Sequence, residues 1–144
     1  MHIDDFKSAL VYIEDMMKMN LSFDRVGFVY WSTKYYDVKP RSIPPKKVYA
    51  RAKENYPGSG GGTNASCIVD PFLEGKLRSC RPDLMIVFTD GYISADLNKK
   101  HESWIKRNQR KILWVLTPDG TDDLIKDFDP SCKRRVVKMT DNKI

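Results

Sequence analysis

The sequence predicts an α/β fold: a doubly wound, mostly parallel open sheet with helices on both faces. Helical patterns alternate with short apolar runs along the chain, which is typical of strands joined by helical crossovers. Two runs, D-L-M-I-V-F-T-D over 83–90 and I-L-W-V-L over 112–116, are almost continuously apolar, as in strands buried on both faces. The length of 144 residues fits one domain. We therefore expect a single domain spanning 1–144.

The first expected elements are a helix and a strand. Apolar residues recur at helical spacing over 4–19, and Asp4 and Asp5 favour the positive end of the helix dipole. The run R-V-G-F-V-Y-W-S over 25–32 is β-branched and aromatic, and predicts a strand covered on both faces, with 35–38 as a possible neighbour. Prolines at positions 40, 44 and 45 are expected to break regular structure.

The later elements continue the alternation of helices and strands. The region 46–56 is compatible with either a short helix or irregular chain. We expect a glycine-rich loop over 57–64, a short helix over 65–77, a central strand over 83–90, a solvated helix over 99–110, a buried strand over 112–116, one or two helical turns over 122–128, and an edge strand over 136–139.

Composition excludes several classes of protein. With 41% hydrophobic and 31% charged residues, the chain is not a disordered tail. No apolar run approaches the ~20 residues that span a bilayer, so we expect no membrane segment. The three cysteines are odd in number and form no C-x-x-C pair, which indicates reduced thiols and a cytoplasmic location. The net charge of +6 permits polyanion contacts without establishing them.

Two loops carry the residues most suited to chemistry. G-G-G-T ends at Thr63, and F-T-D-G places Asp90 at the end of the strand over 83–90. Functional sites of open α/β sheets lie at the carboxyl ends of the strands. A hydroxyl and a carboxylate are hard oxygen donors that suit Mg²⁺ or Mn²⁺. No lysine follows the glycines, so the loop is not a phosphate-binding P-loop.

In these motifs the sequence resembles the von Willebrand factor A family, in particular the domains found beside metallopeptidase-like modules in bacterial and phage proteins. The resemblance rests on G-G-G-T at 60–63, a following helix, P-D-L-M-I-V-F-T-D-G at 82–91, and the strand R-V-G-F-V-Y-W-S. It implies a metal-ion-dependent adhesion site, with Thr63 as the ligand from the second loop and Asp90 as the residue from the third.

The first loop of that site, D-x-S-x-S, has no match in this chain. The resemblance therefore implies that the usual first, central strand is missing, as though the numbering began at an internal methionine. We expect Mg²⁺ or Mn²⁺ binding to be weak or absent. The strands near Val26 and Leu84 should either pair directly or leave a slot that another segment or a second copy fills, which permits a homodimer by segment exchange.

The leading functional hypothesis is a non-enzymatic module that binds a protein partner, with an acidic residue of the partner completing the coordination of the metal. The residues expected to face the partner are Gly61, Gly62, Gly91, Tyr92 and Ser94.

Two alternatives stay open. A nucleic-acid-binding protein would use the basic residues Lys106, Arg107, Arg110 and Lys111, although such a run is also typical of a solvated helix face. An enzyme is the least supported hypothesis. No convincing nucleophile accompanies His2 or His101 in the sequence, and no base can be identified for Cys67 or Cys80. An aspartate-based phosphotransferase would need a first, nucleophilic aspartate two residues before Asp90, where Phe88 stands.

Overall fold

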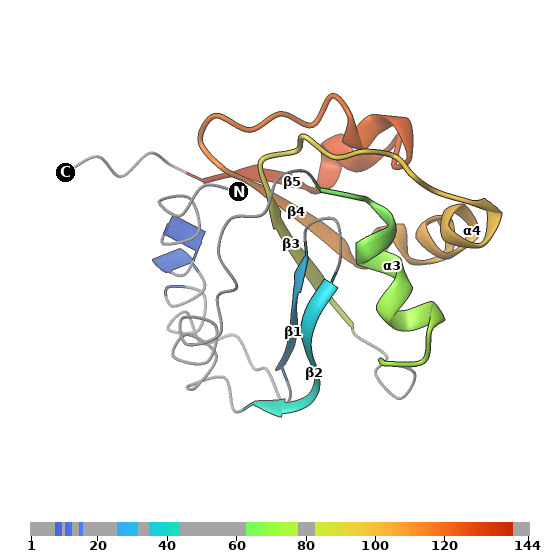
Figure 1. Ribbon diagram of the computed structural model, residues 1–144. Helices are drawn as coiled ribbons and strands as arrows, with labels where there is room; N and C mark the ends of the chain where they lie inside the picture. The colour runs from blue at the N-terminus through green and yellow to red at the C-terminus, as the bar shows by residue number, and fades with distance from the viewer. Residues whose placement is uncertain are drawn as a thin grey trace.

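The computed structural model describes residues 8, 9, 11, 12, 15, 26–31, 35–43, 63–77 and 83–139. Its strands form two sheets (Figure 1). The strands β3 (Met85–Thr89), β4 (Ile112–Leu116) and β5 (Val136–Lys138) make a parallel sheet in the order β3-β4-β5. The strands β1 (Val26–Trp31) and β2 (Tyr35–Ile43) pair antiparallel in a second sheet. The α/β class with a parallel open sheet is as predicted.

The middle strand of the parallel sheet is β4. Its residue Trp114 is in register with Val87 of β3 on one side and with Val136 of β5 on the other. The expectation that the strand over 83–90 would be central is wrong for this sheet. Both runs are strongly apolar, and hydropathy reports burial without reporting which strands are neighbours.

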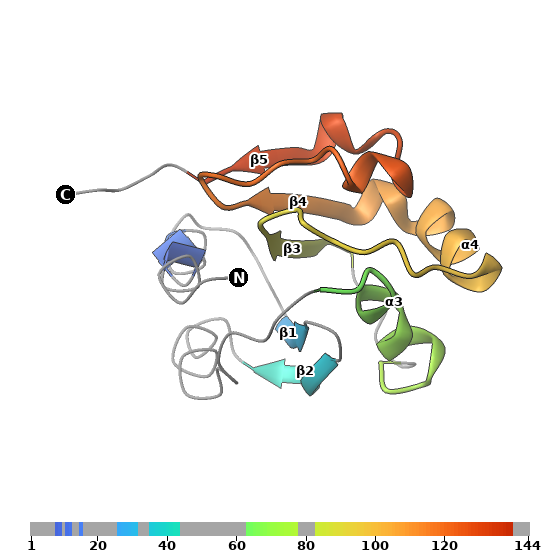
Figure 2. The ribbon, with the colours of Figure 1, turned by 45° about the horizontal axis from the view of Figure 1, so that its top comes forward.

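Described residues pack against both faces of the parallel sheet, and Figure 2 shows the helices of one face beside it. On one face, α3 (Ser66–Leu73) and α4 (Lys99–Asn108) pack on alternate strand residues that include Val87, Ile112 and Trp114. On the opposite face, Ala9 and Tyr12 of the N-terminal helical residues pack near Val115. The Tyr12 and Phe88 rings meet edge to face, with centroids 6.2 Å apart. This division follows from the two-residue period of a strand.

The elements after residue 63 lie where the sequence predicts them. The short helix over 65–77 is α3, with Pro71 inside it, and the solvated helix over 99–110 is α4, continued by a 3₁₀ turn at Gln109–Lys111. The turns expected over 122–128 appear as a 3₁₀ turn at Ile125–Asp127, and another follows at Cys132–Arg135.

The edge strand β5 is secured by a buried polar cluster around Asp129, which is fully buried. Asp129 accepts hydrogen bonds from Trp114 Nε1 at 2.9 Å and from an Arg135 amino group at 2.7 Å. The other Arg135 amino group donates to the Ile112 carbonyl at 3.0 Å. Both carboxylate oxygens of Asp129 are thereby satisfied, as a buried charge requires.

The strand β2 is longer than expected and contains Pro40, which was predicted to end regular structure. The pairing of β1 with β2 shifts register between the partners Phe28↔Lys39 and Val26↔Ile43, and Pro40 lies in that interval. Irregularities of this kind tolerate a residue that cannot donate to the ladder. Pro44 and Pro45 lie outside the described residues, as does the region 46–56.

The strands β1 and β3 belong to different sheets. Of the outcomes expected for the strands near Val26 and Leu84, direct pairing is therefore not the arrangement among the described strands. In the parallel sheet, β3 pairs with β4 on one side, and no other described strand is paired to its other side.

Candidate functional site

Two loops meet at the carboxyl end of β3. The strand ends at Thr89, and Asp90 follows it. Asp90 Oδ1 accepts a hydrogen bond from the Tyr92 backbone N–H at 2.9 Å. The Thr63 hydroxyl donates to the Tyr92 carbonyl at 2.6 Å. The structure thus brings the two predicted metal ligands to the backbone of one residue, and we call Thr63, Asp90 and Tyr92 the Tyr92 rim.

Backbone bonds fix the Thr63 loop beside the segment after β3. Asn64 and Ser94 form a parallel bridge. The Ser94 N–H donates to the Thr63 carbonyl at 2.9 Å, and the Ala65 N–H donates to the Ser94 carbonyl at 2.9 Å. The position of the Thr63 side chain is therefore set by main-chain pairing, which holds it more firmly than an isolated loop would.

Gly91 makes the turn between β3 and Tyr92 possible. Its φ of +86° lies in the region that favours glycine, and a Cβ there would lie 1.6 Å from the Thr121 carbonyl oxygen. In return, the Thr121 N–H donates to the Asp90 carbonyl at 2.9 Å. Gly91, which was predicted to face a partner, is buried, and its conformation shapes the rim.

The residues predicted to face a partner differ in exposure. The Tyr92 side chain is 61% exposed, and Ser94 is also exposed. Thr63 and Asp90 are half-buried. Gly61 and Gly62 lie outside the described residues. The exposed part of the rim is thus the aromatic ring of Tyr92, whose backbone is bonded to a half-buried carboxylate and a half-buried hydroxyl.

As a metal centre, the rim offers one carboxylate and one hydroxyl. Asp90 Oδ2 receives no hydrogen bond from a described residue. Within the described ranges, no three His, Cys, Asp or Glu side chains are grouped to hold a metal ion. Mg²⁺ takes six oxygen ligands and keeps several waters, so these two donors fit a hydrated, weakly held ion.

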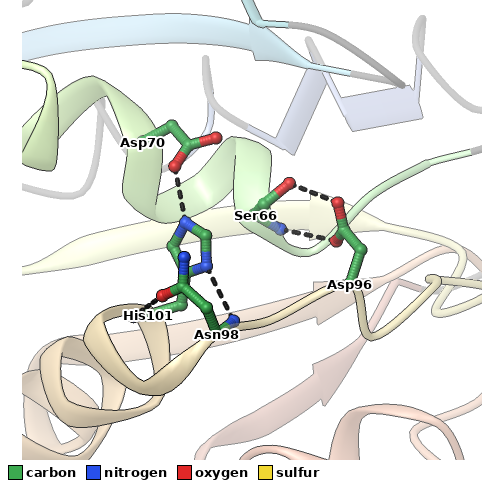
Figure 3. A network of polar contacts seen from close by, with 5 residues as sticks. All are labelled: Ser66, Asp70, Asp96, Asn98 and His101. Atoms are coloured by element: carbon green, nitrogen blue, oxygen red, sulfur yellow. Dashed lines mark hydrogen bonds and ion pairs between the residues drawn. The ribbon is translucent and has the colours of Figure 1, made fainter.

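A second polar cluster lies between α3 and α4 (Figure 3). The imidazole of His101, which is 8% exposed, accepts the Asn98 backbone N–H at Nδ1 over 3.1 Å. Its Nε2 therefore carries the proton and donates to Asp70 Oδ1 at 2.6 Å. The Asn98 side chain accepts the His101 backbone N–H at 3.0 Å, which completes a capping box at the start of α4.

The same cluster caps α3. Ala65, at the N-cap position, makes no side-chain capping bond, and the first turn contains no acidic residue. Asp96 supplies both functions from the loop after β3: its carboxylate accepts the Ser66 backbone N–H at 3.0 Å and the Ser66 hydroxyl at 2.6 Å. A carboxylate at this end also complements the helix dipole. We call Ser66, Asp70, Asp96, Asn98 and His101 the α3–α4 network.

The network was not foreseen from the sequence. The bond between Asp70 and His101 joins residues that are 31 positions apart. Asn98 followed by a helical pattern was a readable capping signal, whereas the pairing of Asp70 with His101 depends on how the helices pack. His101 is buried, and its side chain bonds Asp70 and the backbone of Asn98.

The network contains serine, histidine and aspartate without forming a catalytic relay. The Ser66 hydroxyl donates to Asp96, and both nitrogens of His101 are occupied by other groups. The neighbouring thiol of Cys67 is buried, and burial, reinforced by the charges of Asp96 and Asp70, raises its pKa to about 11. A nucleophilic cysteine requires the opposite shift.

The basic residues of the alternative hypothesis are solvent-exposed. Lys106 and Arg107 lie on α4, and Arg110 and Lys111 lie in the 3₁₀ turn that follows. None of the four forms an ion pair with another described residue.

No protein-family model matches the chain, and no curated protein matches it. Among solved structures, it is similar to an aerotolerance-related membrane protein from Bacteroides fragilis NCTC 9343, crystallised with multiple mutations to serines. The TM-score is 0.63 at 13% identity, over 95% of this chain and 81% of that chain. An uncharacterized membrane-spanning protein from Vibrio fischeri gives a TM-score of 0.40 at 15% identity, over 92% of this chain and 76% of that chain. The first likeness shows that the two chains share an α/β fold.

None of the described helices has the length and apolar character needed to cross a membrane.

Proposed function

We propose that this chain is a non-enzymatic protein-interaction module, similar to von Willebrand factor A domains, that binds its partner through the Tyr92 rim. The observation that carries the proposal is the convergence of Thr63 and Asp90 on Tyr92 at the carboxyl end of β3. The fold shared with the Bacteroides fragilis protein supports the architecture that this proposal needs.

The chemistry of the rim suits recognition of a partner. Tyr92 offers a largely exposed aromatic ring on a backbone held at both its N–H and its carbonyl. Anchored aromatic side chains give contact area at a low cost in conformational entropy. A weakly bound Mg²⁺ or Mn²⁺ on Asp90 and Thr63 would leave coordination positions for an acidic residue of the partner.

The proposal includes the absence of catalysis. Among the described residues, the candidate nucleophiles are unsuited: Ser66 is bonded to Asp96, Cys67 and Cys132 are buried, and burial raises the pKa of both thiols. It also includes a cytoplasmic location, where both thiols stay reduced.

Metal binding at the rim is tested by titrating isotope-labelled protein with Mn²⁺ and following its amide NMR signals. We expect selective loss of the Thr63, Tyr92 and Ser94 signals, with weak affinity, and loss of the effect in Asp90→Asn. Glu102→Gln removes the same charge from an exposed position on α4 and serves as the control. Broadening that is centred elsewhere, or that survives Asp90→Asn, contradicts a metal site at the rim.

Partner binding is tested by placing a photo-crosslinking aromatic amino acid at Tyr92 and, as a control, at Leu124, which is 40% exposed. We expect one discrete protein adduct from position 92 that is absent from position 124. Adding Thr63→Val and Asp90→Asn should reduce the adduct. Equal labelling from both positions contradicts the proposal.

A further inference from the structure

A shallow basic groove, wide open to solvent, runs along the exposed side of α4, and its lining residues are distinct from those of the Tyr92 rim. It has a volume of about 660 Å³ and is lined by Leu73, Lys99, Lys100, Ser103, Lys106 and Arg107. The α4 residues of the groove recur at intervals of three and four, so they form one stripe of the helix. The opposite stripe, with His101, Trp104 and Ile105, is buried. We call the six lining residues the α4 groove.

The two helices that line the α4 groove, α3 and α4, are held together by contacts on their buried sides. Phe72, next to Leu73 at the end of α3, stacks on Trp104 with ring centroids 4.8 Å apart. The bond from His101 to Asp70 ties the same two helices at 2.6 Å. A ligand would meet a surface that is already shaped, which lowers the entropy lost on binding.

The charges of the α4 groove are not neutralised within the described structure. Its four cationic side chains are exposed, and none forms an ion pair with a described residue. Lys99 and Lys100 also occupy the first turn of α4, where the helix dipole disfavours positive charge. Glu102 is the acidic residue of that turn. An anionic ligand would reduce both the repulsion among these cationic side chains and their unfavourable interaction with the helix dipole.

We infer that the α4 groove binds an acidic segment of a partner protein that carries an aliphatic side chain. The argument for a peptide comes from Leu73, which is 39% exposed and lies among the cationic residues. A phosphate backbone offers no apolar group for it. The groove also lacks an aromatic side chain on which a base could stack, since Trp104 is 9% exposed and faces the core.

The test uses fluorescence anisotropy with the whole chain and three labelled probes. They are a glutamate-rich peptide containing leucines, the same peptide with the leucines replaced by serine, and a single-stranded oligothymidylate. We expect the leucine-containing peptide to bind most tightly, with an affinity that falls as salt is added. Tighter or equal binding of the oligothymidylate overturns the inference in favour of a nucleic-acid surface.

The variants separate position from total charge. Replacing Lys106 and Arg107 by glutamine should weaken binding of the leucine-containing peptide about tenfold, from two exposed charge contacts. The matched control replaces Lys133 and Arg134, which are exposed on a 3₁₀ turn, and removes the same charge. An equal loss in the control shows nonspecific attraction to a basic protein and overturns the inference.

A second variant tests the apolar contribution. Leu73→Ser should weaken the leucine-containing peptide while leaving the serine-containing peptide unchanged. Because Leu73 is exposed, the variant should stay folded, which circular dichroism checks. Unchanged binding of both peptides contradicts a role for Leu73. Since the groove excludes Thr63, Asp90 and Tyr92, failure of this test leaves the function proposed for the rim untouched.

Discussion

The Tyr92 rim and the α3–α4 network each combine a hydroxyl with carboxylates of aspartate, and the two clusters are bonded differently. In the network, side chains bond to one another and to helix ends, and Ser66 and His101 are buried. In the rim, Thr63 and Asp90 bond to the backbone of Tyr92, while the ring of that residue stands in solvent. The polar groups of the α3–α4 network hold two helices together. The Tyr92 rim instead leaves oxygen atoms and an aromatic ring accessible to a ligand.

This contrast shows that polar residue types alone do not locate a site. The network contains a serine, a histidine and two aspartates, the residue types found in many catalytic sites. Their hydrogen bonds satisfy the buried groups, however, and leave no nucleophile paired with a base. The rim has fewer polar groups, but Asp90 Oδ2 receives no hydrogen bond from a described residue. Substitutions in the α3–α4 network should therefore lower the stability of the fold strongly. Substitutions of the rim side chains should mainly affect binding.

The largest effect is expected where the backbone of the rim is most constrained. Gly91→Ala must move the Cβ away from the Thr121 carbonyl oxygen and also adopt a positive φ. We expect a loss of roughly 3 kcal/mol or more in the free energy of unfolding, measured by urea denaturation. Gly75 also has a positive φ, of +81°, so Gly75→Ala measures the cost of placing alanine in that backbone conformation alone. We expect that cost to be about 1 kcal/mol. Similar losses in the two variants would show that the approach to Thr121 is unimportant.

His101→Ala tests the structural role of the network. The substitution removes the bond to Asp70 and leaves the Asn98 N–H without its acceptor. We expect the free energy of unfolding to fall by about 2 kcal/mol, because two part-buried hydrogen bonds are lost and the buried imidazole leaves a cavity. Lys126→Ala, which breaks an exposed pair with Asp122 at 3.6 Å, should change it by less than about 1 kcal/mol.

A readout beyond stability distinguishes a structural His101 from a functional one. His101→Gln keeps a hydrogen-bonding side chain and should recover part of the stability. In that variant, the response of the Tyr92 amide signal to Mn²⁺ should be the same as in the native chain. A loss of the Mn²⁺ response in a folded His101→Gln protein would mean that the rim and the network are coupled.

The thiol of Cys67, beside the network, makes stability depend on alkaline pH. Its pKa is raised from 9.0 to about 11 by burial and by the charges of Asp96 and Asp70. Between these values the unfolded chain loses the proton and the folded chain keeps it, so stability is complete below pH 9.0 and falls as the pH rises toward about 11. The loss is on the order of 3 kcal/mol.

Urea denaturation of the native chain and of Cys67→Ala at a series of pH values isolates this contribution. The difference in unfolding free energy between the two proteins should shift across the interval from pH 9.0 to about 11 and stay constant below it. Other groups titrate equally in both proteins and cancel. A difference that does not vary with pH would contradict the raised pKa of Cys67.

How far the sequence predicted these features depends on whether each is local. The strands β3 and β4 and the helix α4 follow from runs and periods within the chain. The place of Asp90 at the carboxyl end of β3 follows from the apolar run that ends there, whereas the position of Thr63 depends on its bonds to Tyr92 and Ser94. By contrast, the pairing of Asp70 with His101, the central place of β4 and the tolerance of Pro40 all depend on which segments become neighbours. Hydropathy patterns carry no information about that choice.

The smallest effect on stability is expected for the rim side chains. Thr63→Val removes a hydroxyl that donates to the Tyr92 carbonyl, and Asp90→Asn removes the charge while keeping an acceptor for the Tyr92 N–H. Both side chains are half-buried, so water can replace the lost bonds, and each variant should lose less than about 1 kcal/mol. Binding should respond differently: Asp90→Asn is expected to abolish Mn²⁺ broadening of the Tyr92 signal, whereas Thr63→Val should weaken it. If either variant instead lost as much stability as His101→Ala, the rim would be a structural cluster like the network, and the contrast between them would disappear.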